Sequence, residues 1–280
     1  MARIAVKLLA GAAVLAAGVA PGFAADIYEA PPPVIEAPAP VYQPEPIDVG
    51  GWYIRGDVDY HWSNYRGGNY ITYGPPPGTG TFDFGELRGA WSVGAGVGYQ
   101  VNRYLRTDLT LDYLASSKFN GQTSGFCGGV ACTSVDTSAY KALLMLANAY
   151  VELGTWHKIT PYVGAGIGGA HVSWDDLNNT AGGITTIHAG SSNWRFAWAL
   201  MAGASYCLTD NLKLDAGYRY TNVAGGRMFE YASGVAPGFD EGFDVHEARL
   251  GLRYQFGGQS SCAEPEYVAY EPPAPAPIYK

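Results

Sequence analysis

The sequence predicts an all-β protein, an eight-stranded antiparallel transmembrane β-barrel with disordered Pro-rich extensions at both ends. Three observations predict it: segments that alternate apolar and polar side chains, connections that alternate between short and long, and abundant aromatic residues. The 280 residues include 21 Tyr, 7 Trp and 38 Gly, whereas only 15% are charged. This composition is unusual for a soluble α/β enzyme and suits a sheet with aromatic girdles. The net charge of −8, with no basic stripe, argues against a nucleic-acid partner.

Residues 1–24 are typical of a secretory signal peptide. Two basic residues precede an apolar run that is too short to span a bilayer comfortably and that ends at Pro-Gly. Small residues at 22 and 24 predict cleavage after Ala24, so that the mature chain begins Ala25-Asp26. The alternative, an uncleaved anchor helix, would need a longer apolar run.

Pro-rich segments flank the part of the chain that we expect to fold. Residues 25–49 and 257–280 cannot build a core, and their composition favours extended, partly polyproline II conformations. We therefore expect residues 50–256 to form the barrel, with residues 25–49 as a periplasmic linker and residues 257–280 as a periplasmic tail.

Eight segments within residues 50–256 have the two-residue period of a β-strand. In the first, Trp52, Ile54 and Val58 share one face, while Arg55 and Asp57 share the other. The predicted strands are residues 51–62, 88–100, 104–115, 139–153, 159–173, 194–207, 212–222 and 244–256. The fourth is the least regular, because its Leu-Leu-Met-Leu-Ala run also suits a helix.

The connections between these segments alternate between two lengths. Residues 101–103, 154–158 and 209–211 are short enough for hairpin turns, whereas the other four connections have about 20 residues or more, namely 63–87, 116–138, 174–193 and 223–243. Outer-membrane barrels have this pattern, with short periplasmic turns and long extracellular loops. A soluble sandwich has no reason for it, and structureless loops of this length are uncommon in compact domains. The alternation therefore predicts that the apolar faces meet lipid and that both termini are periplasmic.

The polar faces of the predicted strands carry acids and bases in about equal numbers. An eight-stranded barrel leaves an interior just wide enough for side chains, and a charge buried there needs a partner. We therefore predict a neutralised charge network that plugs the lumen and permits little or no conduction; a wider barrel would solvate these faces instead. The predicted network comprises Arg55, Asp57, Asp59, Arg106, Asp108, Asp112, Glu152, Arg195, Lys213, Asp215, Arg219, Glu247, Arg249 and Arg253.

The first predicted strand, Gly-Trp-Tyr-Ile-Arg-Gly-Asp-Val-Asp-Tyr at residues 51–60, resembles the opening strand of the small outer-membrane proteins of alphaproteobacteria. That family includes major surface antigens and opacity-type porins. The similarity continues in residues 94–99, 161–168 and 250–256, in the family's order, and covers nearly all of the folded part. The resemblance implies an eight-stranded outer-membrane barrel with roles in envelope integrity and surface presentation, and it implies no catalytic residues.

Further expectations concern partners. We expect contact with outer-membrane lipid and lipopolysaccharide, insertion by the barrel-assembly machinery, and no cofactor or metal site. Such barrels commonly end on the aromatic residue that the assembly machinery recognises, whereas about 24 residues follow Phe256 here. An insertion signal at Phe256 would therefore have to work from an internal position.

The mature N-terminus suggests a second partner. In relatives of this group, an N-terminal Ala-Asp before a Pro-rich segment can be joined covalently to peptidoglycan through its free amine. Ala25 and Asp26 match that start, and residues 25–49 as polyproline II would span up to roughly 75 Å. We therefore predict a peptidoglycan linkage at Ala25, with an unlinked, disordered leader as the alternative.

The four cysteines belong to an exported chain, so disulfides are permitted. Cys127 and Cys132 enclose Gly-Gly-Val-Ala in a predicted loop and are expected to pair. Cys207 lies on the inner face at the periplasmic end of its strand, and Cys262 follows the last strand at the same end. We predict that these two also pair and pin the tail across the barrel mouth, with two reduced thiols as the alternative.

Three other functions compete with a structural role. Exposed loop aromatics favour an adhesin or surface antigen, because aromatic residues are common at interfaces; packing against the barrel rim would bury them instead. These aromatics are Tyr65, Tyr70, Tyr73, Trp174 and Tyr231. A narrow channel is the second alternative.

The third alternative is a lipid enzyme. His171 and Ser173 resemble the base and nucleophile of outer-membrane lipid A deacylases. The acid that should orient the His is missing from the neighbouring strand, unless Asp175 or Asp176 folds back, and His61 with Ser63 repeats the spacing by chance. The chain is therefore predicted not to be an enzyme.

Overall fold

The computed structural model describes residues 50–73, 77–232, 235–257 and 262. The predicted signal peptide, the linker with Ala25 and Asp26, and all of the tail except Gly257 and Cys262 lie outside the described residues. Regular structure in the described part is entirely β and comprises fourteen strands. Among these residues no helix is long and apolar enough to cross a membrane.

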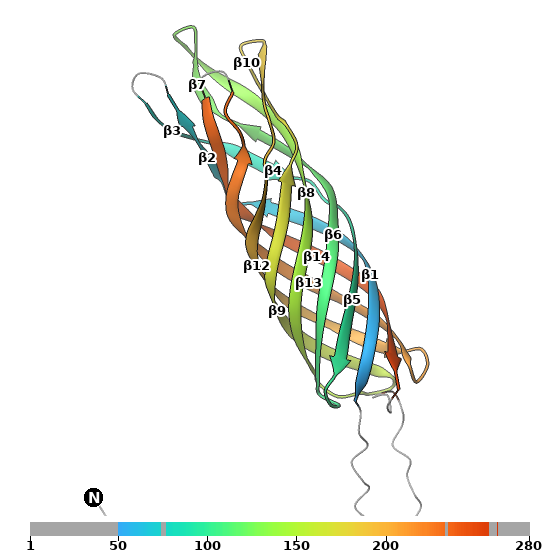
Figure 1. Cartoon of the computed structure of the whole chain (residues 1–280). Coiled ribbons are helices and arrows are strands. Elements are labelled where there is room, and N and C mark those ends of the chain that lie inside the picture. The colour runs from blue at the N-terminus through green and yellow to red at the C-terminus, as the bar shows by residue number, and fades with distance from the viewer. Residues whose placement is uncertain (1–49, 74–76, 233–234, 258–261, 263–280) are drawn as a thin grey trace, which may run out of the picture. The chain divides into compact units, whose positions relative to one another are not determined.

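Eight long strands form a closed antiparallel ring, which confirms the predicted fold (Figure 1). In ring order they are β1 (Gly51–Tyr65), β5 (Ala90–Gln100), β6 (Leu105–Gln122), β8 (Val130–Glu152), β9 (Ile159–Trp174), β12 (Ser192–Cys207), β13 (Leu212–Phe229) and β14 (Val235–Phe256). The ring closes where β1 pairs with β14, from Trp52 opposite Phe256 to Tyr65 opposite Phe243. Closure leaves the ring without an unpaired edge, as a sheet in lipid requires.

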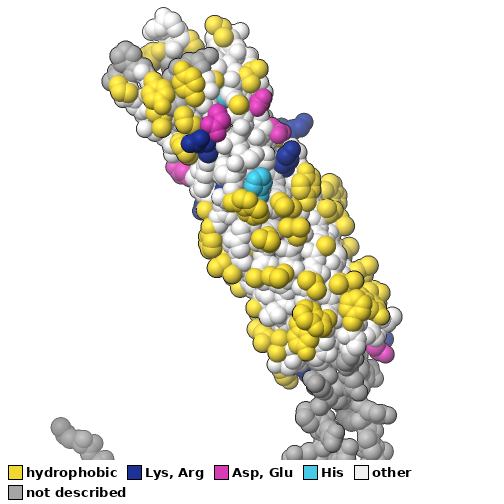
Figure 2. Space-filling view, in the orientation of Figure 1, with side chains coloured by type: hydrophobic (Ala, Val, Ile, Leu, Met, Phe, Trp, Pro, Cys, Tyr) yellow, Lys and Arg dark blue, Asp and Glu magenta, His cyan; other side chains and the backbone are white. Residues whose placement is uncertain are grey.

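The ring has an apolar outer face and a polar inner face along the half that begins at the short turns. On β1, Trp52 is 61% exposed, while the inward Arg55 is only 6% exposed. The same alternation, in the predicted parity, holds on the other seven ring strands. Exposed aromatics form two bands, one with Trp52, Tyr99 and Tyr254 and the other with Tyr60 and Trp91. Figure 2 shows the apolar belt that results.

The ring strands are longer than a membrane crossing needs. β8 has 23 residues and therefore runs for roughly 75 Å, whereas a crossing takes about 9–11 residues. On β1 the stretch Trp52–Trp62 already connects the two aromatic bands. The remaining half of β8 and its neighbours therefore project beyond the belt.

Six short strands complete this projection, which we call the collar. They are β2 (Gly68–Thr72), β3 (Gly78–Thr81), β4 (Phe84–Leu87), β7 (Ser124–Cys127), β10 (Leu177–Ala181) and β11 (Ile184–His188). β2 pairs with β14, β4 with β6, and both β7 and β10 with β8, so the collar is hydrogen-bonded to the barrel. In Figure 2 a band with charged side chains separates the apolar belt from apolar side chains on the collar.

The prediction of four long loops was therefore wrong over much of their length. Gly128-Gly129 and Gly182-Gly183 turn two collar hairpins, and all four glycines have positive φ, which is the conformation that a two-residue hairpin turn needs. Gly-Gly between β-branched residues is a hairpin signal in the sequence. The predicted short connections, in contrast, are the turns of the structure, because residues 101–104, 153–158 and 208–211 join ring neighbours.

The position of the lipid boundary gives a first prediction. Leu109 lies outward between the two aromatic bands, and Leu109→Arg should lower the free energy of unfolding in phospholipid vesicles by about 2–4 kcal/mol. Ile187→Arg, on the outward side of the collar, should change it by at most about 0.5 kcal/mol. Urea titration of the two variants measures the difference, and equal losses would contradict a membrane boundary below the collar.

Candidate functional site

The inner face of the barrel holds all fourteen residues of the predicted charge network. Each is between 0% and 8% exposed. Twelve of them join in one continuous series of ion pairs, namely Arg55, Asp57, Asp108, Arg106, Glu152, Arg253, Asp215, Arg249, Asp59, Asp112, Arg219 and Glu247. Lys213 is buried on β13 two residues before Asp215. Arg195 belongs to a separate pair nearer the collar.

Arg55 connects the two halves of this series. Its Nη2 lies 2.7 Å from Asp57 Oδ1, and its Nη1 lies 3.2 Å from Asp108 Oδ2. From Asp108 the pairs continue through Arg106 and Glu152 toward the turn end of the barrel. From Asp57 they continue through Arg249 toward the collar. Arginine suits this position because its planar guanidinium donates to two carboxylates at once.

Uncharged groups and glycines complete the network. The Tyr53 hydroxyl donates to Asp108 Oδ2 at 3.0 Å, and Asn148 Nδ2 donates to Asp108 Oδ1 at 2.8 Å. A Cβ at Gly94 would collide with the carboxylate of Asp112, and one at Gly251 with that of Asp57. The glycines of the inner face therefore provide the room in which the carboxylates lie.

Of the ion pair between Arg195 and Asp240, only Arg195 belongs to the predicted charge network. Arg195 Nη1 lies 2.6 Å from Asp240 Oδ1, whereas Asp240 falls in the predicted loop of residues 223–243. Asp240 Oδ2 also accepts a hydrogen bond from Trp174 Nε1 at 3.1 Å. The two-residue period of β14 would have placed Asp240 outward, because Phe243, Val245 and Glu247 are the buried residues of that strand. Gly242, which has a positive φ, lies between the two parities, and Asp240 is buried beyond it.

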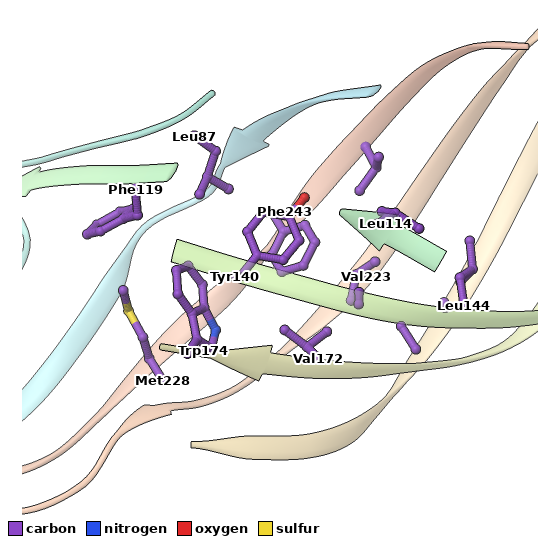
Figure 3. Packing of buried hydrophobic residues seen from close by; sticks show 14 of the residues in the cluster. Leu87, Leu114, Phe119, Tyr140, Leu144, Val172, Trp174, Val223, Met228 and Phe243 are labelled. Carbon is purple, nitrogen blue, oxygen red and sulfur yellow. The ribbon is translucent and has the colours of Figure 1, made fainter. Parts of the chain in front are cut away.

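Above the ion pairs, toward the collar, the lumen is filled by apolar side chains that the sequence analysis missed (Figure 3). Tyr140 and Phe243 have ring centroids 4.5 Å apart, and the Trp174 ring lies 5.5 Å from that of Tyr140. Leu144 and Leu146 are buried in this cluster, while Met145 between them faces outward. The irregular Leu-Leu-Met-Leu-Ala run is therefore a strand that is apolar on both faces.

Apolar side chains also remain exposed at the collar tips. Phe126 is 80% exposed, Ile184 73% and Val130 70%. The predicted loop aromatics divide between two environments. Tyr73 and Tyr231 are exposed, with ring centroids 6.2 Å apart, whereas Trp174 is buried and Tyr65 and Tyr70 are half-buried against Phe82.

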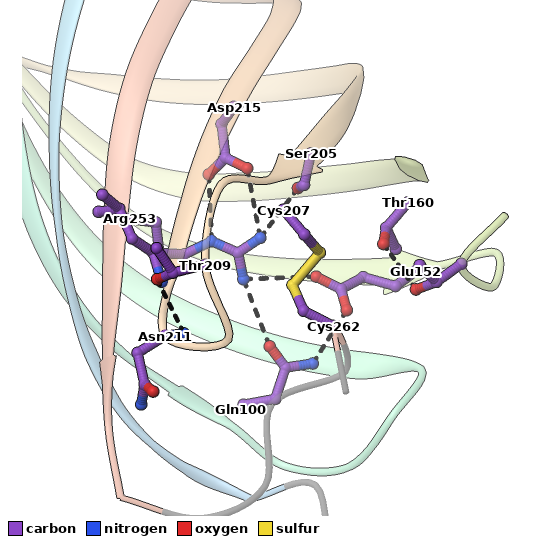
Figure 4. The surroundings of a disulfide bond; sticks show 12 residues. Gln100, Glu152, Thr160, Ser205, Cys207, Thr209, Asn211, Asp215, Arg253 and Cys262 are labelled. Carbon is purple, nitrogen blue, oxygen red and sulfur yellow. Dashed lines mark hydrogen bonds and ion pairs between the residues drawn. A yellow bond between two sulfur atoms is a disulfide. The ribbon is translucent and has the colours of Figure 1, made fainter. Parts of the chain in front are cut away.

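Two disulfides lie at opposite ends of the barrel. Cys127 pairs with Cys132 in the β7–β8 hairpin. Cys207 pairs with Cys262 at the turn end, next to the ion pairs of Arg253 with Glu152 and Asp215 (Figure 4). These are the pairings expected from the sequence, and the second one holds a residue of the tail against the inner face.

The residues considered for catalysis have other contacts. The His171 ring packs edge-on against Trp194, and Ser173 Oγ lies 2.6 Å from Ser192 Oγ. Asp176 accepts a hydrogen bond from the backbone N–H of Gly190. Among the residues that the structure describes, no three His, Cys, Asp or Glu side chains gather in a way that would hold a metal ion.

Comparison with known proteins gives one family and several relatives. Residues 34–256 match the family model for the outer membrane protein beta-barrel domain. An uncharacterized protein of Brucella suis is 40% identical over 256 residues, which cover 78% of this chain and 89% of that protein. Outer membrane protein PagN of Salmonella typhimurium is 28% identical, over 49% of this chain and 59% of PagN. A putative adhesin of Rickettsia canadensis is 29% identical, over 47% of this chain and 58% of the adhesin.

The central place of Arg55 gives a second prediction. Arg55→Met keeps the bulk but leaves two buried carboxylates short of a partner, so the free energy of unfolding should fall by about 3–5 kcal/mol. Arg227→Met removes a half-exposed ion pair with Glu230 and should cost at most about 1 kcal/mol. Urea titration in detergent micelles compares the variants. A loss for Arg55→Met as small as that of the control would indicate a hydrated lumen.

Proposed function

The chain belongs to the outer membrane protein beta-barrel domain family, and on this premise we propose that it is a surface adhesin whose filled barrel carries a binding collar outside the outer membrane. In this proposal the apolar belt lies in the membrane, the collar is extracellular and the short turns are periplasmic. The barrel is the support and the collar tips are the binding surface.

The filled lumen indicates that the barrel serves to carry the collar and does not conduct solutes. The ion-pair series occupies the half near the short turns, and the apolar cluster occupies the half near the collar. A conducting pore needs a continuous polar path, and the apolar cluster interrupts it. This arrangement disfavours the narrow-channel alternative.

The single observation that carries the proposal is the apolar surface at the collar tips. Phe126, Val130 and Ile184 are exposed at the two collar hairpins that Gly128-Gly129 and Gly182-Gly183 turn. Figure 2 shows apolar side chains on the collar, separated from the apolar belt by a band with charged side chains. In this proposal the membrane covers the belt and leaves these residues uncovered. Exposed apolar groups that gather on a surface mark binding sites for other molecules. The relatives from Rickettsia are themselves named putative adhesins, which agrees with this role.

A cell-adhesion assay tests the proposal. A laboratory bacterial strain that displays the chain should be retained on at least one surface of a panel coated with fibronectin, laminin or collagen. The double variant Phe126→Ser, Ile184→Ser should reduce the retained cells at least tenfold, because a factor of ten corresponds to about 1.4 kcal/mol and two side chains at the centre of an interface together contribute more than that.

The matched control is Thr133→Ala, which trims an exposed polar side chain on the same β7–β8 hairpin as Phe126 and should leave retention unchanged. Surface antibody labelling confirms that all three proteins are displayed equally. Failure of the wild type on every coating, or equal retention of the double variant, would reject the adhesive role.

A second role, as a tether to the cell wall, is favoured by a different observation. β1 begins and β14 ends at the same rim, where Trp52 is opposite Phe256 and the disulfide between Cys207 and Cys262 lies. The chain therefore enters and leaves the barrel at the end opposite the collar. If the collar is extracellular, Gly50 and Gly51 lie at the periplasmic rim, and the α-amine of Ala25 is proposed to be joined to peptidoglycan.

Mass spectrometry tests the tether. After boiling in sodium dodecyl sulfate, part of the chain should remain with the sacculus, and lysozyme digestion should release it with a muropeptide on the Ala25 amine. The mass of the released chain serves as the control, because a chain that was trapped but not linked would be released without the mass of a muropeptide. If only free Ala25 amines are found, the linkage is excluded, and the adhesive role is unaffected.

A further inference from the structure

A cavity of about 350 Å³ lies within the collar, above the apolar cluster of the barrel. Half-buried and buried aromatic rings of Tyr70, Phe82 and Phe229 line one part of it. Polar side chains of Asp136 and Asn179 line another part, and Phe126 at the exposed tip marks its outer side. We call this cavity the cup. Its volume falls within the range of small-molecule sites.

The charge of the cup wall comes from Asp136. Asp136 is fully buried on β8 and accepts hydrogen bonds from Ser134 Oγ at 2.9 Å and from Asn179 Nδ2 at 2.5 Å. Each of these bonds uses one lone pair of a carboxylate that has about four acceptor sites. Among the described residues, no Lys or Arg lies in the cup wall or forms an ion pair with Asp136.

This makes Asp136 different from the other buried acids. In the barrel lumen, nearly every carboxylate has an arginine within 4 Å, whereas Asp136 has only neutral donors. His188 also lines the cup, but burial lowers the pKa of its imidazole and so favours the neutral ring. Burial raises the pKa of the Asp136 carboxyl, because desolvation disfavours its charged form.

We propose that the cup binds a small organic ammonium ion with an apolar body, and that Asp136 is the residue that recognises its charge. A cation within a few ångströms would compensate the buried carboxylate, which is otherwise costly to keep ionised. The faces of Tyr70, Phe82 and Phe229 suit both the apolar body and the cation, because aromatic rings attract cations. Anionic ligands are disfavoured, since the described wall offers them no cation.

Ser134 and Asn179 act as positioning residues in this site. They fix the Asp136 carboxylate through their hydrogen bonds, while the side chain of Asn179 belongs to β10 and that of Asp136 to β8. The pairing of these two strands therefore holds the recognition group in place. The inference concerns a small ligand inside the collar and goes beyond the adhesive surface at its tips.

Calorimetric titration of the full chain in detergent micelles at neutral pH tests the proposal. The probes are tyramine, which is an aromatic ammonium ion, and 4-(2-hydroxyethyl)phenol, in which a hydroxyl replaces the ammonium group. The wild type should bind tyramine about tenfold or more tightly than the neutral probe, as expected for a hydrogen bond or contact with a buried charge. Asp136→Asn is nearly isosteric and should abolish this preference.

Asp175→Asn is the matched control, because Asp175 is an exposed acid of the collar outside the cup, and it should keep the preference. Heat-modifiable migration on gels establishes that each variant is folded. If Asp136→Asn does not fold, the comparison of the two probes on the wild type still decides. Equal binding of both probes, no binding of tyramine, or an unchanged preference in Asp136→Asn would overturn the proposal.

Discussion

The structure depends on one constraint: an ionised side chain inside an eight-stranded barrel must find its counter-charge inside the same barrel. The lumen is too narrow to hydrate a charge fully, and the outer face of the barrel meets lipid. Arg55 meets this constraint by joining Asp57 to Asp108, and so links two groups of ion pairs into one series. The register of the strands follows, because a slip of one residue would turn these side chains toward lipid.

Much of the barrel could be predicted from the sequence because its signals are local. A two-residue period assigns each side chain to a face without knowledge of the partner strand, and residues such as Trp52 and Arg55 follow it. The turns at residues 101–104 and 208–211 were recognisable because they are short. The pairing of Cys207 with Cys262 could be inferred because Cys207 ends its strand on the inner face and Cys262 follows the last strand closely. Both positions indicate the same rim of the barrel.

The collar and the apolar cluster could not be predicted in the same way. Leu144 and Met145 are both apolar, so periodicity alone does not reveal that one is in the lumen and the other outside. Asp240 was missed because a long Gly-rich connection does not resemble a strand, although it pairs with Arg195. The cup depends on Asp136 and Asn179, which are distant in sequence and meet only because β10 pairs with β8. Such sites are properties of strand pairing and not of any single segment.

The hydrogen bonding of the collar to the barrel has a mechanical consequence. β8 passes without interruption from the turn end of the barrel to the β7–β8 hairpin, and β6 and β9 pair with it along most of the belt. A tensile force applied at the hairpin would act along the strand and load this ladder in shear, so that many backbone hydrogen bonds would resist together. A cell held by these hairpins in flowing liquid would thus transmit drag directly into its envelope, without first unravelling the part of the molecule that makes the attachment.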